Sequence, residues 1–208
     1  MSNHKSTLLL ITLLAAALAS VACASSKSAS NDEVVVLDTN YGQIVIQFYR
    51  QEAPRHTANF KELAKQGFFD GTKFHQIIRY QGNTLGVLGG DPTTKRASMS
   101  EWGKDYPEQS TVAAEYNPKL KHVRGIITAA TRPGEPDTHT SQFVICVAEA
   151  PMLDEQKLSI FARVLEGMNV VDSIVRAPTW PKTQTPRDPV VVNKAYVTKL
   201  DALDAGAK

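Results

Sequence analysis

Short apolar runs rich in β-branched and aromatic residues recur along the chain from residue 34 onward, separated by glycine, proline or asparagine. Runs of this length and composition are typical of β-strands. The turn-forming residues 39–42 between the first two runs indicate a hairpin. We predict strands over residues 34–38, 43–48, 73–80, 84–88, 111–115, 125–130, 142–147, 160–164 and 190–200.

Two other segments show helical spacing of their apolar residues. In residues 54–66, Phe60, Leu63 and Ala64 recur on one face, and Pro54 is suited to the first helical position. Residues 168–175 place a second apolar stripe on one side. Many short strands with two separated helices favour a mainly β domain, in which a closed barrel is capped by the helices.

The N-terminus has the layout of a secretory signal peptide: Lys5, an uncharged run over residues 6–22, and small residues around Cys23. The strongly apolar part, residues 8–19, is shorter than the ~20 residues that a membrane-spanning helix needs. Two processing routes stay open. Cleavage follows the small residues at this point, or the segment is a lipoprotein signal and Cys23 carries lipid.

These features predict four parts of the chain. Residues 1–23 form the signal peptide, and the serine-rich residues 24–33 form a linker. Residues 34–201 form one domain, and residues 202–208 form a C-terminal tail. We expect an exported protein that is either periplasmic or anchored to a bacterial membrane through lipid on Cys23.

Composition and charge narrow the function only by exclusion. The chain is 42% hydrophobic and 21% charged, which is ordinary for a globular domain. Its net charge of +2 argues against a dedicated nucleic-acid surface. Only Cys146 lies within the predicted domain, where an apolar run surrounds it, so we predict a small buried residue rather than a nucleophile. The histidines show no metal-ligand spacing.

Seven short strings occur in the order and spacing found in the cyclophilin family of peptidyl-prolyl isomerases, and the resemblance spans roughly residues 34–200. Any one string is weak evidence, but the ordered set is specific. The strings are Ala58-Asn59-Phe60, Phe74-His75-Gln76-Ile77-Ile78, Gly89-Gly90-Asp91-Pro92, His122-Val123-Arg124-Gly125, Ser141-Gln142-Phe143-Val144-Ile145, Leu153-Asp154 and Phe161-Ala162-Arg163-Val164.

The resemblance implies an eight-stranded antiparallel barrel capped by two helices, with a shallow groove on its outer face. It implies neither a metal nor an organic cofactor. The expected partners are proline-containing segments of unfolded or exported proteins. We expect a monomer that meets the membrane only through an eventual lipid anchor.

The family places an arginine after Phe-His, and here that position is Gln76. The family arginine donates to the prolyl nitrogen as the peptide bond twists. A glutamine amide can still donate, but charge-assisted hydrogen bonds are roughly twice as strong as neutral ones. We therefore expect turnover about 10²–10³ lower than with arginine. The alternative is that Gln76 is a polar residue on the solvent side of a strand, without a catalytic role.

Other groove positions follow from the resemblance one at a time. Gln142 matches the glutamine that holds the substrate backbone and is the second catalytic position. Val144 is smaller than the usual phenylalanine, which predicts a shallower proline pocket. Leu153 matches the pocket leucine, and Met152 stands where a larger residue is common.

The remaining expected substrate-binding residues line the rest of the groove. The stretch opposite the proline pocket, which receives the residues preceding proline, is matched by Ala130, Thr131 and Arg132. Leu88 replaces a groove glutamine, and Leu158 (with Lys157 as the alternative) replaces a groove histidine. His75 is the neighbour of Gln76. The segment between Phe74 and Gly89 is about four residues longer than the common family form, so the alignment within it stays open. Arg132 is a better candidate than Arg79 for a compensating donor, because Arg79 lies an odd number of residues from Gln76.

Two functions remain open at this point. One is an isomerase that assists the folding of exported proteins, with activity reduced at Gln76. The other is a catalytically weak module that binds proline segments as a chaperone or adaptor.

Overall fold

The computed structural model describes residues 32–96, 98–103 and 110–206. The predicted signal peptide, Cys23 and nearly all of the predicted linker lie outside these residues. Within them, no helix is long and apolar enough to cross a membrane.

Eight strands form one antiparallel sheet in the order β3-β4-β6-β5-β7-β2-β1-β8. Their bounds are β1 Glu33–Thr39, β2 Gly42–Phe48, β3 Gln76–Tyr80, β4 Asn83–Gly89, β5 Ile126–Ala129, β6 Phe143–Cys146, β7 Ile160–Glu166 and β8 Val192–Lys199. The helices are α1 Pro54–Lys65, α2 Pro151–Glu155, α3 Met168–Arg176 and α4 Leu200–Gly206. Short 3₁₀ turns are η1 Pro92–Lys95, η2 Met99–Glu101 and η3 Pro136–Thr138.

The ladder ends at β3 and β8, so among the described strands hydrogen bonds do not close the sheet into a ring. The segment just before β3 does meet the start of β8: the N–H of Val192, the first residue of β8, donates to Thr72 O at 2.9 Å, and Lys73 forms an isolated bridge with Val191. The eight antiparallel strands agree with expectation, whereas the closed barrel stays a prediction.

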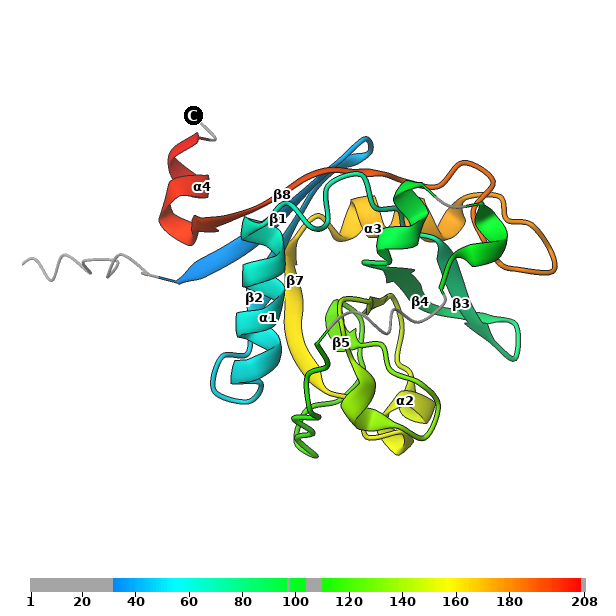
Figure 1. Ribbon diagram of the computed structural model, residues 1–208, viewed down its shortest axis with the longest axis horizontal. Coiled ribbons are helices and arrows are strands. Elements are labelled where there is room, and N and C mark those ends of the chain that lie inside the picture. The colour runs from blue at the N-terminus through cyan, green and yellow to red at the C-terminus, as the bar shows by residue number, and fades with distance from the viewer. Residues whose placement is uncertain (1–31, 97, 104–109, 207–208) are drawn as a thin grey trace, which may run out of the picture.

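The first hairpin is buried on both faces, which explains why its apolar residues do not alternate with polar ones. Val35, Leu37, Ile44 and Ile46 point into the main core. The outer face, including Val34, is covered by side chains from β7, β8 and α4. Figure 1 shows α4, in red, at the end of β8, on the opposite side of the molecule from the β3–β4 hairpin. The residues predicted as a C-terminal tail therefore begin inside α4.

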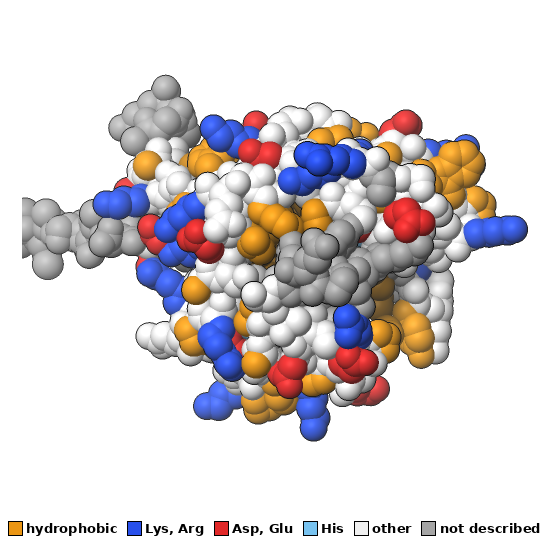
Figure 2. Space-filling model, in the orientation of Figure 1, with side chains coloured by type: hydrophobic (Ala, Val, Ile, Leu, Met, Phe, Trp, Pro, Cys, Tyr) orange, Lys and Arg blue, Asp and Glu red, His pale blue; other side chains and the backbone are white. Residues whose placement is uncertain are grey.

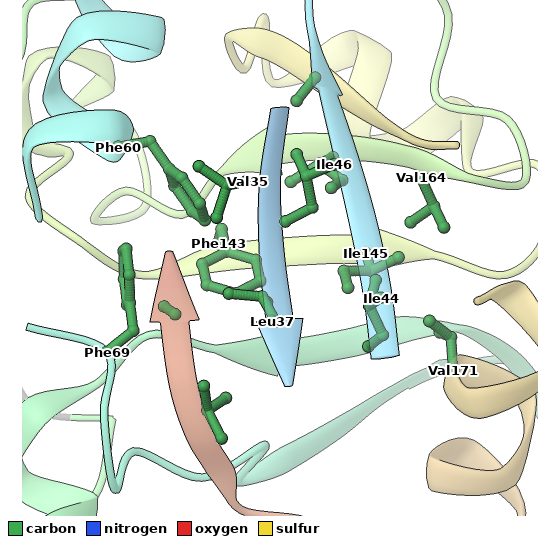
Figure 3. Packing of buried hydrophobic residues seen from close by; sticks show 14 of the residues in the cluster. Val35, Leu37, Ile44, Ile46, Phe60, Phe69, Phe143, Ile145, Val164 and Val171 are labelled. Atoms are coloured by element: carbon green, nitrogen blue, oxygen red, sulfur yellow. The ribbon is translucent and has the colours of Figure 1, made fainter. Parts of the chain in front are cut away.

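Helices α1 and α3 are the two that the apolar spacing predicts, and they are confirmed. Helix α1 packs against β8 and β7, and α3 packs against β2 and β4, so the two lie apart (Figure 1). Phe60 on α1 contacts Phe69 and Phe143, with ring centroids 4.6 and 5.2 Å apart. Figure 3 shows these rings beside the core side chains of β1 and β2. The core thus holds the sheet and both helices together.

The strand predicted over residues 111–115 is wrong. This segment makes one isolated bridge, between Val112 and His139, and its other hydrogen bonds join it to α1, Asp137 and Ser159. The Glu115 carboxylate accepts from the backbone N–H groups of Arg55 and His56, both at 2.9 Å. These donors belong to the first turn of α1, where backbone N–H groups lack a partner within the helix. The segment is therefore held by capping of α1 and by side chains that accept from its backbone, and not by a strand ladder.

Candidate functional site

A row of directly paired residues crosses the sheet at the groove. Gln76 on β3 pairs with Leu88 on β4, Leu88 pairs with Val144 on β6, and Val144 pairs with Thr128 on β5. Residues directly opposite one another in a ladder point to the same face, and neighbouring strands lie about 4.8 Å apart. Gln76 is exposed, and its backbone lies about two strand spacings from that of Val144.

An apolar cluster separate from the main core lies on this face. Buried Val144, Leu153 and Leu158 form part of it, and the half-buried Met152 packs against them. Leu88 and Ala130 also pack against the cluster. The structure therefore brings together six of the residues expected in the groove, from β4, β6, α2 and the segments after β5 and α2. A surface of this kind can hold an apolar ring such as that of proline.

Sequence reasoning missed Leu85, which is 6% exposed and belongs to this cluster. Strict alternation from Leu88 would point Leu85 to the other face of the sheet. A bulge between Ile78 and Arg79 shifts the pairing at this point, so that Leu85 faces the cluster. The available signal was the extra length of the segment between Phe74 and Gly89, which accommodates the bulge.

Close approach of strands β4 and β6 sets the shape of the cluster. Gly86 pairs with Cys146, and a Cβ atom on Gly86 would lie 2.6 Å from the carbonyl oxygen of Ile145. Only glycine fits there. Cys146 is buried as predicted, and burial raises the pKa of its thiol to about 12. It therefore acts as a small apolar residue in the cluster.

A hollow of about 190 Å³ adjoins the apolar cluster. Its lining includes the expected groove residues Leu88, Ala130, Thr131, Arg132 and Gln142. Leu88 and Ala130 belong to both the hollow and the cluster. The Gln142 carbonyl accepts from the N–H of Ala130 at 3.0 Å, which fixes β6 against the end of β5.

The sequence did not assign the other residues lining the hollow, which are Gly103, Pro133, Thr138 and Thr140. Gly103 is held there by Asp91, whose Oδ2 accepts from its N–H at 2.5 Å. Asp91 is fully buried and also accepts from Thr93. The Gly-Gly-Asp turn thus ties β4 to the rim of the hollow.

Helix α2 is anchored beneath the apolar cluster by His122. Nδ1 of His122 lies 2.7 Å from Asp154 Oδ1, and Nε2 lies 3.1 Å from the Thr128 hydroxyl. Burial alone would raise the pKa of Asp154, but hydrogen bonds from His122 bring it below its usual value. The carboxylate therefore stays ionised at neutral pH and holds Met152 and Leu153, on the same helix, in place.

The expected residue His75 lies elsewhere, and so does Arg79, the weaker candidate for a compensating donor. His75 is 2% exposed and adjacent to exposed Gln76 in the chain, so its ring is packed inside rather than displayed in the groove. Burial lowers the pKa of His75, and the nearby Asp91 carboxylate opposes this shift. Arg79 donates to Gln184 Oε1 at 2.7 Å, in the loop before β8. Among the described residues, no three His, Cys, Asp or Glu side chains gather as a metal site requires.

Comparison with known proteins identifies one family that matches most of the chain. Residues 34–197 match the family described as cyclophilin type peptidyl-prolyl cis-trans isomerase. Peptidyl-prolyl cis-trans isomerase-like 1 of Rhizopus delemar is 44% identical over 143 residues, covering 68% of this chain and 79% of that protein. The Homo sapiens protein of the same name is 38% identical over 163 residues, covering 78% and 90% respectively.

A solved structure gives the same result. The crystal structure of a Cryptosporidium parvum cyclophilin type isomerase, determined in the presence of the dipeptide Ala-Pro, has a TM-score of 0.67 and 26% identity. The structural match covers 79% of this chain and 98% of the Cryptosporidium parvum chain. The chain therefore belongs to the cyclophilin family of peptidyl-prolyl cis-trans isomerases.

Proposed function

We propose that this protein isomerises peptide bonds before proline in unfolded or exported proteins, at a rate limited by Gln76. The observation that carries the proposal is the row Gln76–Leu88–Val144, which sets an exposed amide beside an apolar cluster and a polar hollow. The cluster would take the proline ring. Gln142 and the hollow would take the peptide that precedes it.

Isomerisation needs little chemistry but strict geometry. Rotation about the peptide bond faces a barrier of ~20 kcal/mol, because amide resonance is lost in the twisted state. The prolyl nitrogen then gains a lone pair that can accept a hydrogen bond. A donor at this position stabilises the twisted state more than the planar one, which is the requirement for catalysis.

Gln76 can supply that donor through its side-chain amide, without a positive charge. A neutral hydrogen bond is roughly half as strong as a charge-assisted one. Losing one well-placed donor of this kind typically costs about 10²–10³ in turnover. We therefore expect slow catalysis in the protein as it stands and faster catalysis when arginine is restored.

A second candidate function follows from two positions at which the chain differs from the usual family residues, Gln76 and Val144. With Gln76 uncharged and Val144 in place of a larger aromatic residue, the groove can bind proline segments without turning them over. Such a protein would act as a chaperone or adaptor. The two functions share the binding surface and differ only in the rate of isomerisation.

The test is an isomerisation assay on an Ala-Pro peptide, with wild type compared against Gln76→Arg and Gln76→Leu. Both substitutions are at an exposed position, so both variants should fold. For the isomerase, wild type exceeds Gln76→Leu, and Gln76→Arg gains about 10²–10³. Wild type equal to Gln76→Leu, with activity only in Gln76→Arg, supports the binding module. Wild-type activity equal to that of Gln76→Arg overturns the role given to Gln76.

Export is the second part of the proposal, and it rests on the sequence of residues 1–23. The protein would act after secretion, either free in the periplasm or held to a membrane by lipid on Cys23. Mass spectrometry of the mature N-terminus in a bacterial host distinguishes these states. An added diacylglyceryl mass at Cys23 indicates the anchor, and an unmodified cleaved terminus indicates the free form. An intact Met1 would contradict export.

A further inference from the structure

The β3–β4 hairpin extends the groove face beyond the apolar cluster. Every residue of β3 from Gln76 to Tyr80 pairs with one residue of β4, and the extra residue at the bulge, Leu85, belongs to β4. Side chains therefore alternate regularly along β3, and Gln76, Ile78 and Tyr80 point to the same face of the sheet. Figure 2 shows hydrophobic side chains gathered on the side of the molecule where Figure 1 places this hairpin. Tyr80 thus continues the row of side chains that begins at Gln76.

Ile78 connects Tyr80 with the apolar cluster. The half-buried side chain of Ile78 packs against this cluster, which is proposed to hold the proline ring. Tyr80 lies two residues further along β3, which corresponds to about 6.6 Å of strand, and it is 48% exposed. Between them, Arg79 points to the other face, where its guanidinium donates to Gln184. On β3, this end of the groove therefore presents an apolar and an aromatic side chain.

The hollow and Tyr80 lie at opposite ends of the apolar cluster. Leu88, near the end of β4, lines the hollow, whereas Tyr80 pairs with Asn83, the first residue of β4. A peptide with its residues before proline in the hollow and its proline ring in the cluster therefore leaves the cluster toward Tyr80. An extended chain advances about 3.3–3.6 Å per residue, so the first residues after proline come within reach of the Tyr80 ring.

We infer that Tyr80 makes the groove selective for peptides with an aromatic side chain one to three residues after proline. Packing between two aromatic rings is favourable beyond the burial of their apolar area alone. Tyr80 also lies in the segment between Phe74 and Gly89 that is longer than the common family form, so the preference would belong to this chain and not to the fold. This selectivity rests on the proposed binding of proline peptides at this groove.

The test is an NMR titration with Ala-Pro peptides that carry phenylalanine or glutamine at each of the three positions after proline. At one of these positions we expect wild type to bind the phenylalanine peptide about fivefold more tightly than the glutamine peptide. Tyr80→Ser should lower this preference to about twofold or less, because the ring is gone. Tyr80→Phe should keep the preference, because the ring remains. Position 80 is exposed, so both variants should fold.

Tyr41→Ser is the matched control. Tyr41 is also 48% exposed, but it lies in the turn between β1 and β2, on a separate hairpin, so this variant should keep the preference. Phenylalanine and glutamine peptides that bind equally to wild type would overturn the role given to Tyr80 while leaving the proposed function intact. The same holds for a preference that survives in Tyr80→Ser or is lost equally in Tyr41→Ser. Failure of every proline peptide to bind would overturn both.

Discussion

Two buried histidines are expected to make the stability of the protein depend on pH in the acid range. His56 on α1 and His139 before β6 are 0% and 1% exposed, and their rings stack with centroids 4.9 Å apart. Nδ1 of His56 lies 2.6 Å from Glu115 Oε2. Within the described residues, Nε2 of His56 and both ring nitrogens of His139 have no hydrogen-bond partner.

Protonation of either ring is therefore unfavourable in the folded protein. Burial first, and then repulsion from His56, lowers the pKa of His139 from 6.5 to about 3. Because the unfolded chain takes up this proton near pH 6.5 and the folded chain does not, the stability is complete above pH 6.5 and declines as the pH falls toward 3. Between pH 7 and pH 5 the loss is about 2 kcal/mol for His139 alone.

The assay is urea unfolding at pH 7 and pH 5, with wild type compared against His139→Asn. The variant should lose about 2 kcal/mol less than wild type between the two pH values. Phe161→Leu, which alters a ring packed on His139 but removes no titratable group, should keep the wild-type pH dependence. Burial also lowers the pKa of His56, His75 and His122, so a smaller decline remains in the variant. The same pH dependence in His139→Asn and wild type would refute this reasoning.

Two further predictions concern the groove. Leu153→Ala should cost about 2–4 kcal/mol in urea unfolding, because it opens a cavity in the apolar cluster, and should also weaken proline-peptide binding in an NMR titration. Unchanged peptide affinity in a folded Leu153→Ala would remove the cluster from the binding site. Asp154→Asn should destabilise the protein by about 1–3 kcal/mol, because it weakens the hydrogen bonds between His122 and the Asp154 carboxylate that anchor α2. Here hydrogen exchange should rise first in α2, and a uniform rise across the sheet would contradict the local role.

The sequence predicted most elements because their patterns reflect local physical preferences. The apolar spacing of α1 and α3 matched two helices, and every predicted strand run except residues 111–115 matched a strand of the structure. The predicted strand over residues 111–115 failed because tertiary contacts decide that segment: Glu115 caps α1 from outside the helix. Helix α4 was missed because its main role, covering the outer face of β1 and β2, depends on long-range packing.

The groove residues could be predicted only where the seven sequence strings align with the cyclophilin family. Gln76, Leu88 and Val144 share one row of the ladder, but a single sequence does not give strand register. The bulge that aims Leu85 at the cluster breaks the alternation on which pattern reasoning depends. The position of His75, in contrast, could have been predicted from the sequence pattern. Simple alternation from exposed Gln76 already predicts that the His75 ring points inward.

The central claim is that the groove beside Gln76 holds a proline peptide and isomerises it slowly. The most direct test is two-dimensional NMR exchange on an Ala-Pro peptide in the presence of the unmodified protein. We predict shifts of the Gln76, Gln142 and Val144 resonances, together with cis–trans exchange faster than in the free peptide and slower than with Gln76→Arg. Shifts confined to residues outside the groove, or exchange no faster than in the free peptide, would contradict it.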